Sequence, residues 1–124
     1  NISKKDKKRI KFIDNFYKKK ITQKSFSEKN MNKVFYYEGK QAVNDILYFR
    51  IIKFKKFDKK LIELTKLYKT RKVPIMPIGA EILMTKYKIS EGKQLGLKLK
   101  MIEEEWVDNN FKISDHQIEN IIKS

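Results

Sequence analysis

The chain contains no cysteine and a single histidine, His116. The absence of cysteine excludes disulfide bonds and metal sites built on thiolates, which is typical of a reducing compartment, and we therefore expect a cytoplasmic protein. One histidine cannot form a histidine-based metal cluster, and any nucleophile with a histidine base would depend on this residue. His116 lies in a sequence typical of a helix start, so we interpret it as an exposed surface residue.

Proline and glycine are also scarce, with two prolines and four glycines in 124 residues. Both prolines and three of the glycines fall between Pro74 and Gly96, and the sequence before them is mostly lysine-rich and amphipathic. No apolar run approaches the roughly 20 residues that span a bilayer, so we expect no membrane partner. The sequence begins at Asn1 rather than methionine, and we expect it to be a fragment of a larger protein.

Positive charge is abundant: 30 lysine and arginine residues face 15 acidic residues, a formal net charge of +15. Such an excess attracts polyanions, and nucleic acid is the first candidate. The alternative is compositional, because a chain rich in lysine, isoleucine and asparagine can simply reflect an AT-rich genome. A membrane-surface role is less favoured, since the basic residues are spread over several segments rather than placed on one amphipathic helix.

Apolar residues recur at helical spacing through the first 73 residues. We predict a helix over residues 3–20 with Ser3 as its N-cap, a second helix to about Glu38, and a third over residues 40–52. A capping box of Ser25 and Glu28 is expected to begin the second helix, with Ser27 and Asn30 as a weaker alternative. The side chains predicted to face inward include Ile10, Ile13, Phe16, Tyr17, Met31, Val34, Phe35, Tyr37, Ala42, Val43, Ile46, Leu47 and Phe49.

Residues 53–60 form a basic junction that contains Phe54 and Phe57, and a helix to about Thr70 is predicted after it. Interleaved aromatic residues and lysines can bind single-stranded bases by stacking. Phenylalanines at helix ends more often anchor a core, and that interpretation is favoured here.

The remaining residues contain the prolines, which should end the preceding helix and keep residues 73–78 extended. We predict helices over residues 80–87, from Gly92 to Trp106, and after a capping box of Ser114 and Gln117. Gly96 is expected to allow close approach by another backbone. The side chains predicted to face inward are Ile82, Leu83, Leu95, Leu99, Ile102, Trp106, Ile118, Ile121 and Ile122.

No stretch alternates with a period of two, so the predicted fold is all-α, a compact array of about six or seven short helices. We divide it into a helical body region, residues 1–73, and a helical tail region, residues 74–124, which we expect to form one compact unit.

No set of residues resembles an active site. Glu103, Glu104 and Glu105 are contiguous, so on a helix they point in three directions and cannot converge on a cation. Gly92-x-x-x-Gly96 lacks the spacing and the lysine of a phosphate loop, although its helix start has free amides that can receive a phosphate. There is no Asp-x-Asp pair to hold two Mg²⁺ ions. We therefore predict no catalytic residue and no metal site in this chain.

The order of the motifs resembles the C-terminal region of bacterial tRNA nucleotidyltransferases (CCA-adding enzymes) and the related poly(A) polymerases. The segments that carry the resemblance are similar to the family's motifs in sequence order, and they are residues 2–10, 34–45, 74–83, 89–96 and 106–114. Met76, Glu81, Ser90 and Lys93 depart from the residues common in the family.

The resemblance implies an RNA-binding module that holds the acceptor and TΨC arms of tRNA while a catalytic head adds nucleotides to the RNA 3′ end. Either CCA addition or poly(A) addition fits the resemblance. Mg²⁺ and CTP or ATP would belong to that absent head, so no cofactor is expected here, and the head and neck would be partners in cis or in trans. The residues expected to contact tRNA or other RNA are Arg71, Lys72, Lys86, Lys88, Gly92, Lys93, Lys98 and Lys100.

Two other functions stay open. One is a helical DNA-binding module in which residues 89–100 act as a helix-hairpin-helix-like clamp on the backbone. The other is a protein-interaction scaffold whose charge reflects genome composition alone, which lysines scattered evenly over the surface would favour.

Overall fold

The computed structural model describes residues 3–55 and 58–124, which contain seven α-helices, one 3-10 helix and no strand. Over these residues the predicted all-α fold and the predicted number of helices are confirmed. Ile2 and Phe57, used in the sequence-based predictions, lie outside the described residues. The chain divides into two compact units, Asn1–Val73 and Pro74–Ser124, and each is described by itself.

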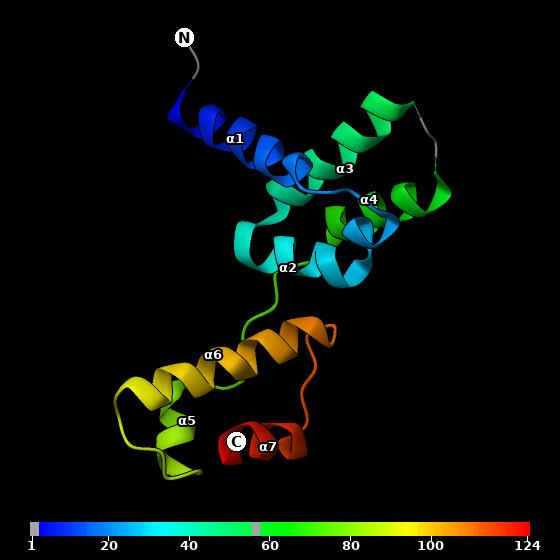
Figure 1. Ribbon diagram of the computed structural model, residues 1–124. Coiled ribbons are helices and arrows are strands. Elements are labelled where there is room, and N and C mark those ends of the chain that lie inside the picture. Colours follow the sequence, from blue (N-terminus) through cyan, green and yellow to red (C-terminus); the bar gives the residue numbers. More distant parts are fainter. Residues whose placement is uncertain (1–2, 56–57) are drawn as a thin grey trace. The chain divides into compact units, whose positions relative to one another are not determined.

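The first unit contains α1 (Lys4–Lys18), η1 (Gln23–Phe26), α2 (Glu28–Glu38), α3 (Lys40–Phe54) and α4 (Lys59–Thr70). Helix α3 is central, because it contacts α1, α2 and α4 (Figure 1). The core side chains of the first unit come mainly from α2, α3 and α4. Those with no exposed surface are Met31, Phe35, Val43, Ile46, Leu47 and Tyr68.

A buried polar network joins α2 to α4. The Tyr68 hydroxyl donates to Oδ1 of Asn32 at 2.6 Å, and the Arg71 guanidinium donates to the same oxygen at 3.1 Å. Asn32 is 1% exposed, so its amide oxygen depends on these donors. Burial raises the pKa of the Tyr68 phenol above its ordinary value, and it stays a neutral donor.

Helix ends in this unit follow local capping chemistry. Ser3 caps α1 as predicted, since its hydroxyl accepts from the Asp6 amide at 3.1 Å. Gly39 ends α2 with φ of 95°, a conformation that favours glycine. The predicted Ser25–Glu28 capping box is wrong, and the alternative residue Ser27 caps α2, with its hydroxyl accepting from the Asn30 amide at 3.2 Å. Ser25 lies in η1, where its hydroxyl accepts from the Thr22 amide instead.

Several side chains predicted to face inward are exposed. Ile10 is 55% exposed on α1, Tyr37 is 50% exposed on α2, and Ile82 is 40% exposed on α5. Helix α1 contains no fully buried residue and contacts α3 alone among its larger contacts, so its apolar stripe is only half covered. The helical period was therefore predicted correctly, but its degree of burial was overestimated.

The second unit contains α5 (Ala80–Thr85), α6 (Lys93–Asp108) and α7 (Asp115–Lys123). Helix α6 contacts both of the shorter helices (Figure 1). The core cluster consists of Leu83, Leu95, Ile102, Ile118 and Ile121. Ser114 and Gln117 form the predicted capping box at the start of α7.

Gly96 does not serve the packing role predicted for it. A Cβ added at this position would meet no other atom within 4 Å, so no backbone approaches it closely. Gly92 differs, because its φ of 140° lies in a region that other residues rarely adopt. None of the helices among the described residues combines the length and the apolar character needed to cross a membrane.

Candidate nucleic-acid interface

Charge is divided very unevenly between the two units. Residues 1–73 contain 23 lysine and arginine residues and seven acidic residues, a formal net charge of +16. Residues 74–124 contain seven lysines and eight acidic residues, a formal net charge of −1. The whole excess of positive charge therefore belongs to the first unit, and any long-range attraction of a polyanion originates there.

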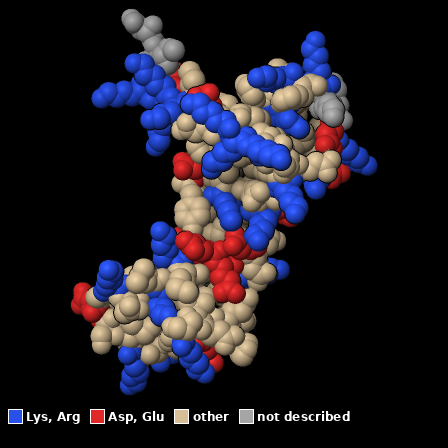
Figure 2. Space-filling view, viewed as in Figure 1, with Lys and Arg blue, Asp and Glu red and all other residues tan. Residues whose placement is uncertain are grey.

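Lysines crowd the first turns of α1, and all of them are exposed: Lys4, Lys5, Lys7, Lys8 and Lys11. Basic side chains cover much of the visible face of the first unit (Figure 2). Cations are unfavourable near a helix N-terminus, because the helix dipole is positive there. A negatively charged partner would remove this local cost, which makes the start of α1 a candidate contact for phosphate.

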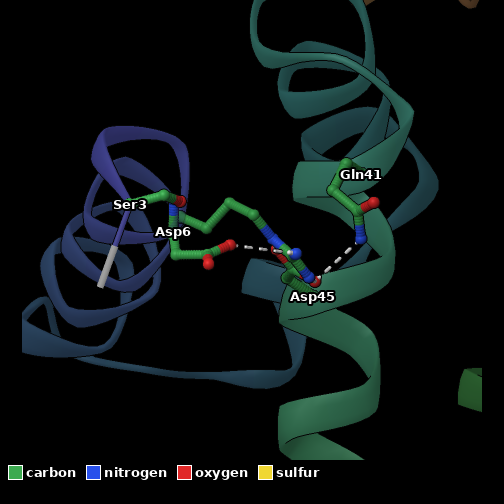
Figure 3. A network of polar contacts seen from close by, with 5 residues as sticks. Ser3, Asp6, Gln41 and Asp45 are labelled. Atoms are coloured by element: carbon green, nitrogen blue, oxygen red, sulfur yellow. Dashed lines mark hydrogen bonds and ion pairs between the residues drawn. The ribbon is translucent and has the colours of Figure 1, made fainter. Parts of the chain in front are cut away.

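An ion pair positions this basic helix on the rest of the unit. The Arg9 guanidinium donates to both carboxylate oxygens of Asp45 on α3, at 2.9 and 3.0 Å, and Gln41 donates to Asp45 at 3.0 Å (Figure 3). The hydrogen bond from Arg9 lowers the pKa of the Asp45 carboxyl below its usual value. Two-pronged contact between a guanidinium and a carboxylate fixes orientation as well as distance, so α1 presents its lysines from a defined position.

The residues predicted to contact RNA in the second unit lie mainly on the connection from α5 to α6. Lys86 follows α5, with its ammonium 5.4 Å from the centre of the Tyr87 ring. Lys88 is exposed and has φ of 59°, Gly92 caps α6, and Lys93 is its first residue. This connection contains Lys86 and Lys88, and Lys93 follows at the start of α6, yet the unit that carries these three exposed lysines is electrically near neutral.

Lys98 is used inside the fold. Its ammonium donates to the carbonyl oxygens of Ile121 and Ser124 at 3.0 and 2.6 Å, and to the Ser124 hydroxyl at 3.2 Å. These contacts satisfy the end of α7, where carbonyl groups lack helical partners. Lys100, two residues further along α6, is exposed.

Arg71 and Lys72 follow α4 and belong to the first unit. The Arg71 guanidinium is engaged by Asn32, lies 3.7 Å from a carboxylate oxygen of Glu28, and stands 5.9 Å from the Tyr68 ring centre. Lys72 is exposed. Of the eight predicted residues, Arg71 and Lys98 thus make structural contacts, whereas the other lysines point to solvent. Sequence reasoning left the α1 lysines out of the set, although their crowding at a helix start was visible.

Across residues 3–55 and 58–124, no three histidine, aspartate or glutamate side chains lie close enough together to hold a metal ion. His116 is exposed in the first turn of α7. Comparison with protein-family models, with curated proteins and with solved structures finds no match. The resemblance to tRNA nucleotidyltransferases therefore depends on the five quoted segments alone.

Proposed function

We propose that this chain is an RNA-binding module like the C-terminal region of tRNA nucleotidyltransferases and poly(A) polymerases. It would hold the acceptor and TΨC arms of a tRNA while a catalytic head, in cis or in trans, extends the RNA 3′ end. The observation that carries the proposal is the net charge of +16 on residues 1–73. The activity of the whole assembly would depend on Mg²⁺ and CTP or ATP bound by that head, in the cytoplasm.

The uneven division of charge argues against genome composition as its only cause. A compositional bias acts on both units alike, yet residues 1–73 contain 20 lysines and residues 74–124 contain seven. The second unit also balances its lysines with eight acidic residues. Positive charge is therefore concentrated where it can act on one partner, which favours polyanion binding over a scaffold role.

The order of the motifs supports RNA as the polyanion. Arg9 and Asp45 come from two separate segments of the resemblance, and they form the ion pair that positions α1. Recognition would operate mainly through phosphates and the shape of the duplex, because side chains cannot read the deep, narrow major groove of A-form RNA. The α1 lysines would supply the main contacts, and Lys86, Lys88, Gly92, Lys93 and Lys100 a smaller second set.

Filter binding of an acceptor–TΨC minihelix tests the proposal, with an RNA duplex of random sequence and a DNA duplex of equal length as matched ligands. The minihelix should bind most tightly, and its affinity should fall by roughly a thousandfold from about 50 to 200 mM salt if six or more phosphates are contacted. Tighter binding of the DNA duplex would favour the helix-hairpin-helix alternative. Binding that does not respond to salt, or the absence of binding, would overturn the proposal.

A further inference from the structure

A groove of about 560 Å³ runs between α1 and α3 in the basic unit. Its size is within the range of about 300–1,000 Å³ that small-molecule sites occupy. Ile10 and Ile13 contribute aliphatic surface, three aromatic rings line it (Tyr17, Phe49 and Phe54), and three cationic side chains stand around it (Lys18, Arg50 and Lys53). Rings and cations in one groove are the features of sites that bind unpaired nucleotides.

Part of the aromatic lining is held rigidly. The Tyr17 hydroxyl donates to the Ile46 carbonyl oxygen at 2.7 Å, so this ring cannot turn away from α3. The Tyr17 and Phe49 ring centres are 4.7 Å apart, and the ring planes are inclined by 46°. Burial raises the pKa of Tyr17 to about 12. A ligand would therefore meet a preformed surface and would not have to order it on binding.

A stack of alternating ring and cation reaches the groove. The central carbon of the Arg50 guanidinium lies 5.0 Å from the Phe26 ring centre and 4.2 Å from the Phe54 ring centre. Phe26 is 5% exposed, whereas Phe54 is 46% exposed, so the stack is closed at one end and open at the other. A planar base can extend such a stack, because both guanidinium groups and aromatic rings stack on bases.

The electrostatics of the groove favour an anionic ligand. Asp14 is the acidic residue that lines it, and this carboxylate is paired with Lys18 at 3.1 Å. Arg50 and Lys53 are then in excess, and the Lys53 ammonium is 5.3 Å from the centre of the Phe49 ring. The surrounding unit carries +16, so a phosphate attached to a bound base would be attracted to this site.

We infer that the α1–α3 groove binds an unpaired nucleotide of the RNA, with its base stacked on Phe54 and its phosphate near Arg50 and Lys53. This inference rests on the proposed RNA-binding function and adds a single-stranded element to the ligand. The 46% exposure of Phe54 argues against the core-anchor role considered for it and supports the stacking role.

Two RNA probes separate this inference from the proposal on which it rests. The first is a single-stranded RNA of about five nucleotides with 2-aminopurine at its centre, whose fluorescence falls when the base stacks. The second is a blunt RNA duplex without unpaired nucleotides. The full chain should quench the first probe on binding and should also bind the second.

Three variants on α3 give the contrast. Phe54→Leu keeps an apolar side chain and removes the aromatic ring, and Arg50→Lys keeps the positive charge and removes the planar guanidinium. Ile52→Ala is the control, because Ile52 is 73% exposed and does not line the groove. Phe54→Leu should weaken binding of the single strand by about tenfold and abolish most of the quenching, since stacking on one aromatic side chain contributes that much. Arg50→Lys should have a smaller effect of the same kind, and Ile52→Ala none.

Duplex binding should change less than about twofold in all three variants, because phosphate contacts elsewhere in the basic unit carry it. Circular dichroism should show that all three variants stay folded at the temperature of the binding assay. The inference is overturned if Phe54→Leu and Ile52→Ala bind and quench the single-stranded probe equally, or if the probe binds without quenching. An apolar protein segment would then be the better candidate for the occupant of the groove. Salt-dependent duplex binding in that case would leave the proposed function standing, whereas quenching without duplex binding would contradict the proposed function alone.

Discussion

The unit of residues 1–73 has a formal charge of +16, whereas the unit of residues 74–124 has −1. They differ inside as well. The first contains the network of Asn32, Tyr68 and Arg71, whereas the second combines an aliphatic core cluster with the ring contact of the buried Trp106 with Phe111. Both units consist of short helices that bury apolar side chains, so the helical pattern alone does not distinguish a surface specialised for a polyanion from one that is not. The two surfaces are distinguished by the balance between lysines and acidic residues within each unit.

Core truncations should have the largest effects and test whether the two units are energetically distinct. Phe35→Ala should cost about 3–5 kcal/mol and Ile102→Ala about 2–5 kcal/mol, since both side chains have no exposed surface and leave cavities. Hydrogen exchange should show the loss of amide protection within the unit that carries each change. Leu97→Ala, at a position that is 47% exposed, is the control. Equal loss of amide protection in both units would instead show that the two units unfold together as a single cooperative fold.

Neutralising matched sets of four lysines compares the two units as RNA-binding surfaces. One set on α1 is changed to glutamine (Lys4, Lys5, Lys7 and Lys8), and the other set lies on and around α6 (Lys86, Lys88, Lys93 and Lys100). The α1 set should weaken minihelix binding by about a hundredfold at low salt. It should also lower the number of counterions released on binding, given by the slope of log affinity against log salt concentration, by about three to four. The second set should cost less.

Cations near a helix N-terminus are unfavourable, so removing four of them should not destabilise α1. A decrease in affinity can then be assigned to the loss of contacts with RNA. A larger decrease from the second set would instead make the α5–α6 connection the principal contact.

The polar network of the first unit should contribute less than the cores but should still be measurable. Asn32→Ala removes the acceptor shared by Tyr68 and Arg71 and should cost about 1–3 kcal/mol, because buried donors lose their partner. Tyr68→Phe should cost about 0.5–1.5 kcal/mol. Urea denaturation measures both changes. Ile118→Val in the second unit, expected at about 0.5–1.5 kcal/mol, is the packing reference, and an Asn32→Ala value below it would show that the network adds little.

Acid should produce the smallest effect, through the ion pair that positions α1. The folded-state pKa of Asp45 is lowered chiefly by its hydrogen bond with Arg9, so the pair contributes stability above the unfolded pKa of about 3.9. This stability is lost as the pH falls through the lower folded value. Asp45→Asn should therefore flatten the pH dependence of unfolding below about pH 4 and leave neutral-pH RNA binding at most modestly weaker. An unchanged acid limb would show that the pair has no net effect.

Much of the fold was predictable because its signals are local. Ser3 and the Ser114–Gln117 pair set helix starts through contacts within one turn, and both were predicted from the sequence. The start of α2 was placed wrongly because two serines with suitable spacing compete there. Choosing between Ser25 and Ser27 requires knowing that the first is already part of a 3-10 turn.

Burial and partners were less predictable, because they depend on residues distant in sequence. Helical spacing put Ile10 inward, but α1 has a neighbour along only part of its stripe. Lys98 was expected to contact RNA, and nothing local indicates that its ammonium reaches α7, 23 residues further on. The groove between α1 and α3 could not be predicted from the sequence, because its aromatic rings come from two helices and are separated by more than 30 residues along the chain.

The contacts of Lys98 have a consequence for the chemical reactivity of the protein. An acylating reagent has to reach the lysine nitrogen, and the nitrogen of the half-buried Lys98 side chain donates to three oxygen atoms at the end of α7 that surround it. Lys98 should therefore be labelled far more slowly than the exposed Lys100 on the same helix. Once acylated, it could no longer neutralise the carbonyl end of α7, so its modification would be expected to loosen that helix.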